Sequence, residues 1–440
     1  MKHFLVMMIV VILAAGWVVS GNQAPRGSST SAAALPPCDP DNGGLKLPQG
    51  FCAVVVADNL GRARHIAVTP NGDLYVRIRG AQGSRQAAEQ DPGGGIVALR
   101  DANGDGKAEV QQRFGNHYGT GMELHNGFLY VSTDLAVLRY RMTPGQLVPA
   151  GEPETIVGGF PEQRGHAAKA FALDDAGRLY VNVGAPSNTC QGQDRTQGAL
   201  GQRPCPQLER QASVWRFSAE RVGQTQEKDG HKFVTGTRNI VAIAWDPASR
   251  AMHALQHGRD QVGQWQGFDE EDNAELPSEE FFRLEDGANF GWPYCYHDRF
   301  QSRRILAPEY GGDGKQVGEC EKYARPLVAF PAHWAPDDLV FYTATQFPAK
   351  YRGGAFIAFH GSWNRAPLPQ GGYQVAFQPM ANGKPTGQWE TFIDGFAGQS
   401  PLMQPQEARH RPAGLALGPD GSLYISDDTA GRIWRILYRR

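Results

Sequence analysis

The chain has 440 residues, with 43 Lys and Arg against 45 Asp and Glu, a formal net charge of −2. This balance argues against a nucleic-acid partner, because such surfaces carry a basic excess. The length allows a sizeable core, and closed all-β folds can reach it as one domain. The 54 glycines, 30 prolines and 10% aromatic residues favour many short strands joined by tight turns.

The N-terminus has the layout of a secretory signal. Lys2 and His3 precede an apolar run over residues 4–19, which is shorter than the roughly 20 residues of a membrane-spanning helix. We predict that residues 1–20 are a signal peptide or an N-terminal anchor and that residues 21–36 are a flexible linker. The protein is therefore expected to be exported, to the periplasm or outside the cell, with membrane attachment only through an uncleaved anchor.

Six cysteines follow this segment. An even number in an exported chain indicates disulfides. They fall into three pairs that are close in sequence, and among the possible connectivities we expect Cys38–Cys52, Cys190–Cys205 and Cys295–Cys320. None lies in a C-x-x-C-H motif, so no covalently attached haem is expected.

One local pattern recurs along the chain: a turn with Gly, then an apolar residue and an alternating strand. Its copies occupy residues 71–78, 126–133, 176–184, 249–258, 352–361 and 420–428. Each is typical of a hairpin turn leading into a strand, and repeated hairpins indicate propeller blades. We predict an all-β fold, a six-bladed β-propeller over residues 37–440, with long loop insertions at 185–214 and 259–345. A β-sandwich is the alternative, but its strands would not repeat this unit.

The segment DANGDGKAEV (101–110) begins like a calcium-binding EF-hand loop. Asp101, Asn103 and Asp105 match its first ligands, but its twelfth position is Gln112 and no flanking helices are expected. A turn between two strands is the favoured interpretation, and a structural Ca²⁺ is the alternative.

His166, Arg238 and Asn239 stand just before predicted strands. A His at a strand mouth can act as a general base near neutral pH, or it can bond a neighbouring turn. An adjacent guanidinium and amide suit an anion with several oxygens, since Arg can bind a carboxylate through two bonds. The alternative for the pair is a surface ion pair beside a turn-forming Asn.

Two further segments suggest ligand contacts. The Gly-containing turn LQHGRDQVG (255–263), after the fourth repeat, could point consecutive carbonyls at a hard cation such as Ca²⁺, or it could be an ordinary loop. Arg409 and Arg411 alternate, so on an extended strand both would point to one face. Two guanidiniums on one face repel unless they share an anion; otherwise they are solvated surface residues.

Several common catalytic motifs are missing from the sequence. It contains no G-x-S-x-G, no H-E-x-x-H, no P-loop and no G-x-G-x-x-G after a strand. Nicotinamide binding by a Rossmann unit is therefore unsupported.

Six ordered motifs resemble the soluble sugar dehydrogenases that depend on pyrroloquinoline quinone (PQQ), in particular the sorbosone dehydrogenase branch. They are GHAAKAFALDDAGRLYVNVG, GTRNIVAIAWDP, LQHGRD, ELPSEEFFRLEDGANFGWPYC, FHGSWNR and RHRPAGLALGPDGSLYISDDTAG, and the resemblance runs from about residue 46 to the C-terminus. It implies a six-bladed propeller with the quinone in a cleft at the top of the ring. It also implies oxidation of a sugar, sugar aldehyde or related alcohol, with electrons passing to a separate acceptor such as a cytochrome or a quinone.

The resemblance also implies roles for the residues above. His166 would be the catalytic base. Contacts to PQQ would come from Arg238, Asn239, Arg409 and Arg411. The backbone carbonyls of Gly258 and Arg259 would bind Ca²⁺.

The chain departs from the family pattern in three places that bear on substrate identity. A family glutamine on the early blades has no clear counterpart near residues 119–122. A basic residue found four positions after the base in glucose-oxidising members is Ala170 here. The family's lysine beside the quinone has no clean match; Arg365 in FHGSWNR is the substitute, with His360 and Trp363 as rivals.

Two other functions compete with this one. A propeller lactonase or hydrolase with a divalent metal would need acidic ligands at several strand mouths, and the sequence offers no clear set. A non-catalytic propeller that binds proteins would leave the Arg409 and Arg411 pair and the Arg238–Asn239 segment unexplained.

Overall fold

The computed structural model describes residues 1, 35–80 and 95–439. The predicted signal or anchor and most of the predicted linker lie outside these residues. The chain divides into a unit that ends at Leu35 and a compact unit, Pro36–Arg440, which holds all the strands. Within the described residues, no helix is long and apolar enough to cross a membrane.

Six sheets of four consecutive antiparallel strands form the compact unit, and we number these blades along the chain. In each blade the first strand lies innermost. Blades 1 to 3 contain β2 (Ala63–Val68), β3 (Leu74–Ile78), β4 (Ile96–Arg100) and β5 (Val110–Phe114); β6 (Met122–His125), β7 (Phe128–Ser132), β8 (Val137–Arg141) and β9 (Glu154–Gly158), with the short parallel β13 (Gln224–Thr225); and β10 (Phe171–Leu173), β11 (Arg178–Val183), β12 (Ser213–Ser218) and β14 (His231–Thr235).

Blades 4 to 6 follow the same order, except that the last strand of blade 6 comes from the start of the chain. They contain β15 (Ile240–Asp246), β16 (Ala251–Gln256), β17 (Glu279–Leu284) and β20 (Val328–Phe330); β21 (Pro336–Phe341), β22 (Ala355–Phe359), β23 (Gln374–Gln378) and β26 (Glu390–Ile393); and β27 (Pro412–Leu417), β28 (Leu423–Asp427), β29 (Ile433–Tyr438) and β1 (Phe51–Ala57).

Short elements decorate the connecting loops. These are the two-stranded pairs β18 (Cys295–Asp298) with β19 (Arg303–Leu306) and β24 (Met380–Ala381) with β25 (Lys384–Pro385), the helices α2 (Gln226–Asp229) and α3 (Glu270–Glu275), and the 3-10 turns η1 (Asn42–Gly44), η2 (Pro206–Glu209), η3 (Val262–Gln264), η4 (Pro308–Tyr310), η5 (Gly318–Lys322), η6 (Ala349–Tyr351) and η7 (Pro405–Glu407).

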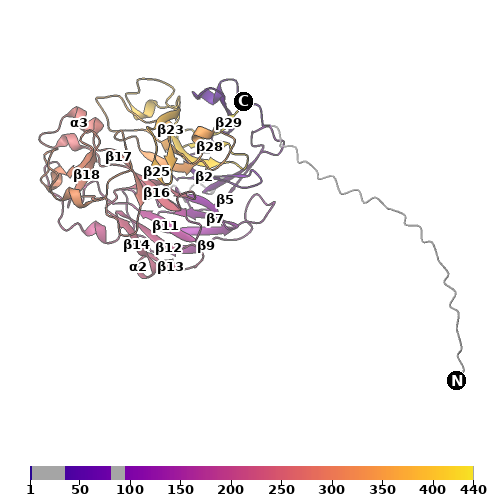
Figure 1. Cartoon of the computed structure of the whole chain (residues 1–440), viewed down its shortest axis with the longest axis horizontal. Helices are drawn as coiled ribbons and strands as arrows, with labels where there is room; N and C mark the ends of the chain where they lie inside the picture. The colour runs from indigo at the N-terminus through magenta and orange to yellow at the C-terminus, as the bar shows by residue number, and fades with distance from the viewer. Residues whose placement is uncertain (2–34, 81–94, 440) are drawn as a thin grey trace. The chain divides into compact units, whose positions relative to one another are not determined.

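The ring is closed in two ways. Each inner strand contacts the next around the axis, and β27 contacts both β21 and β2. In addition, β1 pairs antiparallel with β29, so the first strand of the chain completes the last blade. Figure 1 shows β2, from the N-terminal part of the unit, beside β28 from the C-terminal part. The predicted six-bladed propeller is confirmed.

The six sequence repeats are the second strands of the blades: β3, β7, β11, β16, β22 and β28. The turns that precede them place Gly72 and Gly421 at φ values of 90° and 85°, a conformation that favours glycine. The predicted insertion at 259–345 was wrong in extent, because β17, β20 and β21 lie within it. Glu279 and Glu280 interrupt the apolar alternation that marks the other strands.

The core lies between neighbouring blades. Leu255 and Phe281 of blade 4, for example, pack in one buried cluster with Leu339 and Phe359 of blade 5. Each such side chain contributes about 1.5–3 kcal/mol when fully buried. The three expected disulfides, Cys38–Cys52, Cys190–Cys205 and Cys295–Cys320, are also confirmed.

Candidate functional site

Antiparallel pairing brings one set of loops to a common end of the propeller. Each inner strand starts, and each second strand ends, at this end, which we call the mouth. The mouth therefore consists of the segments before β2, β6, β10, β15, β21 and β27 and after β3, β7, β11, β16, β22 and β28. Propellers and other rigid scaffolds commonly carry their functional residues on such loops.

His166 lies in the mouth segment before β10. Its Nδ1 is 2.6 Å from the carbonyl oxygen of Ala185, which follows β11, so Nδ1 donates and Nε2 keeps its lone pair. No hydrogen bond to Nε2 occurs among the described residues. Burial, followed by the charge of Arg238, lowers the pKa of His166 to about 3. The half-buried imidazole is therefore neutral at ordinary pH.

Gly184 explains how His166 comes to lie against Asn239. A Cβ at Gly184 would stand 2.8 Å from the His166 Cβ and 2.9 Å from the Asn239 Oδ1. The Ala185 amide also donates to the Arg238 carbonyl at 2.7 Å. The structure thus brings His166, Arg238 and Asn239 together.

The Arg238 guanidinium is buried and tied to the loop after β16. Its Nη1 donates to the Gly258 carbonyl and its Nη2 to Asp260 Oδ2, both at 2.7 Å, while Nε has no partner among the residues that the structure describes. Burial lowers the pKa of Arg238 despite the charge of Asp260. Asp260 also accepts from Arg195 at 2.6 Å and from Asn364 at 2.9 Å. Burial alone would raise the pKa of Asp260, but the two guanidiniums hold it well below its usual range.

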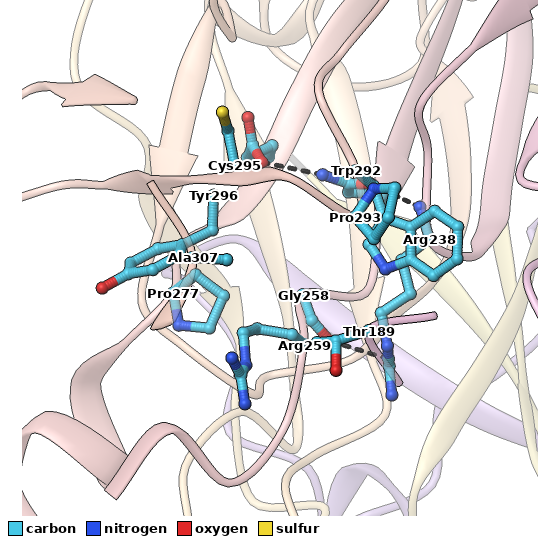
Figure 2. Close-up of a pocket in the computed structure, with 12 residues that line it drawn as sticks. Thr189, Arg238, Gly258, Arg259, Pro277, Trp292, Pro293, Cys295, Tyr296 and Ala307 are labelled. Carbon is cyan, nitrogen blue, oxygen red and sulfur yellow. Dashed lines mark hydrogen bonds between the residues drawn. The ribbon is translucent and has the colours of Figure 1, made fainter. Parts of the chain in front are cut away.

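Gly258 and Arg259 can offer backbone oxygens to a ligand. The Arg259 side chain is engaged elsewhere, pairing with Glu309 at 2.5 Å and donating to the Asp260 carbonyl. Figure 2 shows the Arg238 guanidinium reaching the Gly258 carbonyl. The cavity drawn there has a volume of about 20 Å³, room for about one water molecule and too little for a sugar or a quinone.

The structure does not place Arg409 and Arg411 on one strand. The expectation that both alternate on one strand was wrong, since β27 begins only at Pro412. Arg411 is half-buried; its Nε and Nη2 donate to the carbonyls of His360 and Gly361 at 3.1 and 2.5 Å. Arg409 is exposed, and no partner of its guanidinium occurs in the described ranges.

Of the candidates in FHGSWNR, Arg365 is fully engaged. It pairs with Glu275 at 2.5 Å and donates to the carbonyls of Pro369 and Ala274. His360 Nε2 lies 2.8 Å from Asp428. Trp363, in contrast, is 53% exposed, with the Arg195 guanidinium 6.0 Å from its ring centre.

Sequence reasoning missed the cations of blade 1. Arg64 is buried and bonds Asp337 at 2.7 Å and Asp428 at 2.8 Å. Arg62 comes only within 3.7 Å of Asp428, and the half-buried Arg79 has no side-chain partner in the part of the chain described. The sequence signal that could have found these arginines is their position. Arg62 and Arg79 flank β2 and β3 as Arg238 flanks β15, and Arg64 is the second residue of β2.

The segment next to His166 also holds a basic residue that sequence reasoning did not consider. Lys169 precedes Ala170 and is fully buried, with Nζ 2.5 Å from the Ala167 carbonyl. Burial lowers the pKa of its amine to about 8. Position 170 is therefore Ala where glucose-oxidising members have a basic residue, but Lys169 places an ammonium group one residue away.

The segment at 101–110 is a loop between β4 and β5 without flanking helices, as favoured above. Carboxylate oxygens of Asp101, Asp105 and Glu109 lie within 4.8 Å of one another. Glu109 thus supplies the third carboxylate of this cluster, and Gln112, at the twelfth position of the EF-hand pattern, does not belong to it.

Curated proteins match part of the chain. It is 29% identical over 208 residues to an uncharacterized protein of Borreliella burgdorferi, covering 47% of this chain and 48% of that protein. It is 27% identical over 230 residues to a pyrroloquinoline quinone-dependent pyranose dehydrogenase of Coprinopsis cinerea, covering 46% and 30%. The chain therefore spans about half or less of the length of these relatives.

Solved structures share the fold. The holo PQQ domain of the Coprinopsis cinerea pyranose dehydrogenase has a TM-score of 0.70 at 20% identity, covering 89% of this chain and 97% of that one. The calcium structure of the Trichoderma reesei carbohydrate-active enzyme of family AA12 gives 0.71 at 18%, covering 90% and 97%. The soluble aldose sugar dehydrogenase of Escherichia coli gives 0.55 at 16%, covering 88% and 100%.

A family model ties these observations to one group of proteins. The TrAA12-like model matches residues 45–439, from the segment before β1 to the end of β29. The match includes all six blades and every segment of the mouth. The chain belongs to the TrAA12-like family.

Proposed function

We propose that this protein is a PQQ-dependent dehydrogenase that oxidises a sugar, a sugar aldehyde or a related alcohol and passes the electrons to a separate acceptor. The observation that carries the proposal is the neutral His166 held beside Arg238 and Asn239 at the propeller mouth. The names of the Coprinopsis cinerea relative and of its PQQ domain support the choice of cofactor and substrate class.

The mouth fits a polyanionic cofactor such as PQQ, which carries three carboxylates. Arg79 and Arg409 have no carboxylate partner among the described residues, and Arg62 has only a distant one. Arg238 keeps its Nε free for an acceptor. Guanidiniums bind carboxylates through charge-assisted hydrogen bonds, so we assign these residues, with Arg411 and Asn239, to cofactor binding.

The loop after β16 fits Ca²⁺, which prefers oxygen ligands including backbone carbonyls. The Gly258 carbonyl accepts one bond from Arg238 and retains a second lone pair. We assign Gly258 and Arg259 as the carbonyl ligands. When bound, the quinone would accept a hydride, and Ca²⁺ beside it would act as a Lewis acid.

His166 would take the proton of the substrate hydroxyl on Nε2. The bond from Nδ1 to the Ala185 carbonyl fixes both the tautomer and the direction of the ring. Burial keeps the ring neutral, so Nε2 carries a free lone pair at ordinary pH, while the lowered pKa makes the ring a weaker base. A base placed in this way typically contributes about 10²–10⁴-fold to rate.

Within FHGSWNR, the contacts distinguish the candidates for meeting the cofactor or substrate. Arg365 ties its loop to Glu275, whereas Trp363 presents an exposed ring next to Arg195. We therefore favour Trp363 for direct contact and Arg365 as its support. An exposed aromatic ring can stack on the apolar face of a sugar or on a planar cofactor.

We also propose that the protein works outside the cytoplasm. Three disulfides support this location, since such bonds persist in oxidising compartments.

Reconstitution tests the proposed function. Purified protein mixed with PQQ and Ca²⁺ should change the quinone absorption spectrum and reduce a redox dye when sugars or aldehydes are added. Omitting PQQ should abolish dye reduction. If the spectrum is unchanged while the protein hydrolyses lactones with a divalent metal, the proposal is wrong and the lactonase alternative is favoured.

A further inference from the structure

Strand β17 carries two consecutive buried carboxylates that the proposed mechanism does not use. Glu279 and Glu280 are each 2% exposed and, being adjacent on a strand, point to opposite faces of the sheet. Burying a carboxylate is unfavourable by several kcal/mol unless it is paired or well hydrogen-bonded. The two residues meet this requirement in different ways.

Glu280 is matched by a cation. It forms a buried ion pair with Arg304 and accepts from Gln256 Nε2 at 2.7 Å, directly across the strand pair β16–β17. Gln256 in turn accepts from the Arg238 amide at 2.9 Å. The negative charge of Glu280 is therefore compensated by Arg304.

Glu279 is held by backbone amides instead. Its Oε2 accepts from Gly258 at 2.8 Å and its Oε1 from Ala335 at 3.2 Å. These amides belong to the loop after β16 in blade 4 and to the segment before β21 in blade 5. Within the described ranges, Glu279 makes no ion pair; burial raises the pKa of its carboxyl group to about 7, and the charges of His257 and Arg238 act on it without direct contact.

The other acidic group of this loop is already occupied. Asp260 accepts from Arg238, Arg195 and Asn364 and is therefore fully engaged with donors. Glu279 thus differs from both Glu280 and Asp260: it holds the residue whose carbonyl is the proposed cation ligand, and among the described residues no guanidinium contacts its carboxyl group.

We propose that Glu279 is a positioning residue for a divalent cation on the Gly258 and Arg259 carbonyls. It fixes Gly258 by accepting a hydrogen bond from its backbone amide, ties that loop to blade 5 and, when ionised, adds a negative charge beside the two carbonyls. The inference rests on the proposed function only in the identity of the cation, Ca²⁺. Partners that orient metal ligands typically change metal affinity by roughly 10–100-fold when altered.

The test is a Ca²⁺ titration at fixed PQQ, followed by the absorption spectrum of the bound quinone. Glu279→Gln removes the charge and turns an NH₂ group towards one of the two amides. We expect the Ca²⁺ concentration for half-saturation to rise about 10–100-fold, with the full spectral change restored by excess Ca²⁺. Rescue by the ion would not follow from a general loss of folded protein.

A matched control is Glu123→Gln. Glu123 also bridges two blades, accepting from the Leu173 amide at 3.0 Å, but it does not touch the Gly258 loop. Its half-saturation should equal that of the wild type. Hydrogen exchange without Ca²⁺ or quinone provides a second readout, in which Glu279→Gln should speed exchange of the Gly258 amide.

Glu279→Asp covers the case in which Glu279→Gln fails to fold. Its shorter carboxylate keeps the charge but cannot reach both amides, so half-saturation should still rise. Unchanged half-saturation and exchange in a folded Glu279 variant overturn this inference alone. A wild-type protein whose quinone spectrum responds to PQQ but not to Ca²⁺ overturns it together with the calcium assignment, and no response to PQQ overturns the proposed function.

Discussion

On one side of the mouth, formed by blades 3 and 4, the charged groups are buried and satisfied by one another. Arg238 lies between the Gly258 carbonyl and Asp260, and His166 is fixed by Ala185. On the opposite flank, from blades 6 and 1, Arg409 and Arg79 have no carboxylate partner among the described residues. The first side is organised before any ligand arrives, whereas the second carries charge that an anionic ligand would neutralise.

Asp260→Asn should break the buried side most strongly. It leaves the buried Arg238 and the neighbouring Arg195 without their counter-charge, which typically destabilises by about 3–5 kcal/mol. Thermal melting followed by circular dichroism measures the loss. Asp286→Asn is the control, because Asp286 is exposed and pairs with His231 and Arg216, so its loss should be about 1 kcal/mol or less. Equal losses would show that Asp260 does not act as a buried counter-charge.

His166→Ala should lower turnover about 100-fold or more while PQQ binding is retained, because the general base is lost. Dye reduction at saturating substrate measures turnover, and the quinone spectrum measures binding. His231→Ala, an exposed histidine beside Asp286, should leave turnover unchanged. Wild-type turnover in the His166 variant would exclude it from catalysis.

Arg409→Ala tests the open side. Its guanidinium is exposed, so PQQ affinity should fall only about threefold to tenfold, and the difference should shrink as salt is added. Titration of PQQ at low and high ionic strength gives both values. Arg303→Ala, at an exposed arginine of β19, should change neither. Adding Arg411→Ala to Arg409→Ala should weaken binding further, and unchanged affinity of the double variant would contradict the assignment of both.

The smallest expected effect is the contribution of His166 to the pH dependence of stability. Burial and then Arg238 lower the pKa of His166 to about 3, from about 6.5 in an unfolded chain. Between these values the unfolded chain binds a proton that the folded chain does not, so His166 makes stability fall as pH drops from about 6.5 towards 3. His166→Gln should lose less stability than the wild type between pH 7 and 5. Identical pH profiles of melting temperature would show that His166 titrates normally.

The fold could be predicted because its signals are local. Each second strand follows a glycine turn and alternates with period 2, so the blades are visible without knowing what they pack against. The site could be predicted only where a residue adjoins such a strand, as His166 and Arg238 do. The bonds of Arg64 to Asp337 and Asp428, in contrast, join residues far apart in sequence. The pairing of Arg365 with Glu275 likewise depends on which loops the ring brings together.

β17 shows a different limit of sequence reasoning. The strand was missed because Glu279 and Glu280 do not fit the apolar pattern of the six repeats, and only their partners explain their burial. A rule that expects apolar alternation excludes such a strand. The same two residues then carried the inference about the cation, so this departure from the pattern was informative.

The pairing of β1 with β29 has a consequence for biogenesis. The two strands lie at opposite ends of the propeller sequence, so blade 6 cannot be completed until synthesis has passed β29. Contacts between such distant residues make folding slow, because a very long loop must close first. Until then β1 has no strand to pair with. A chain shortened by the few residues of β29 would lose the strand that pairs with both β28 and β1.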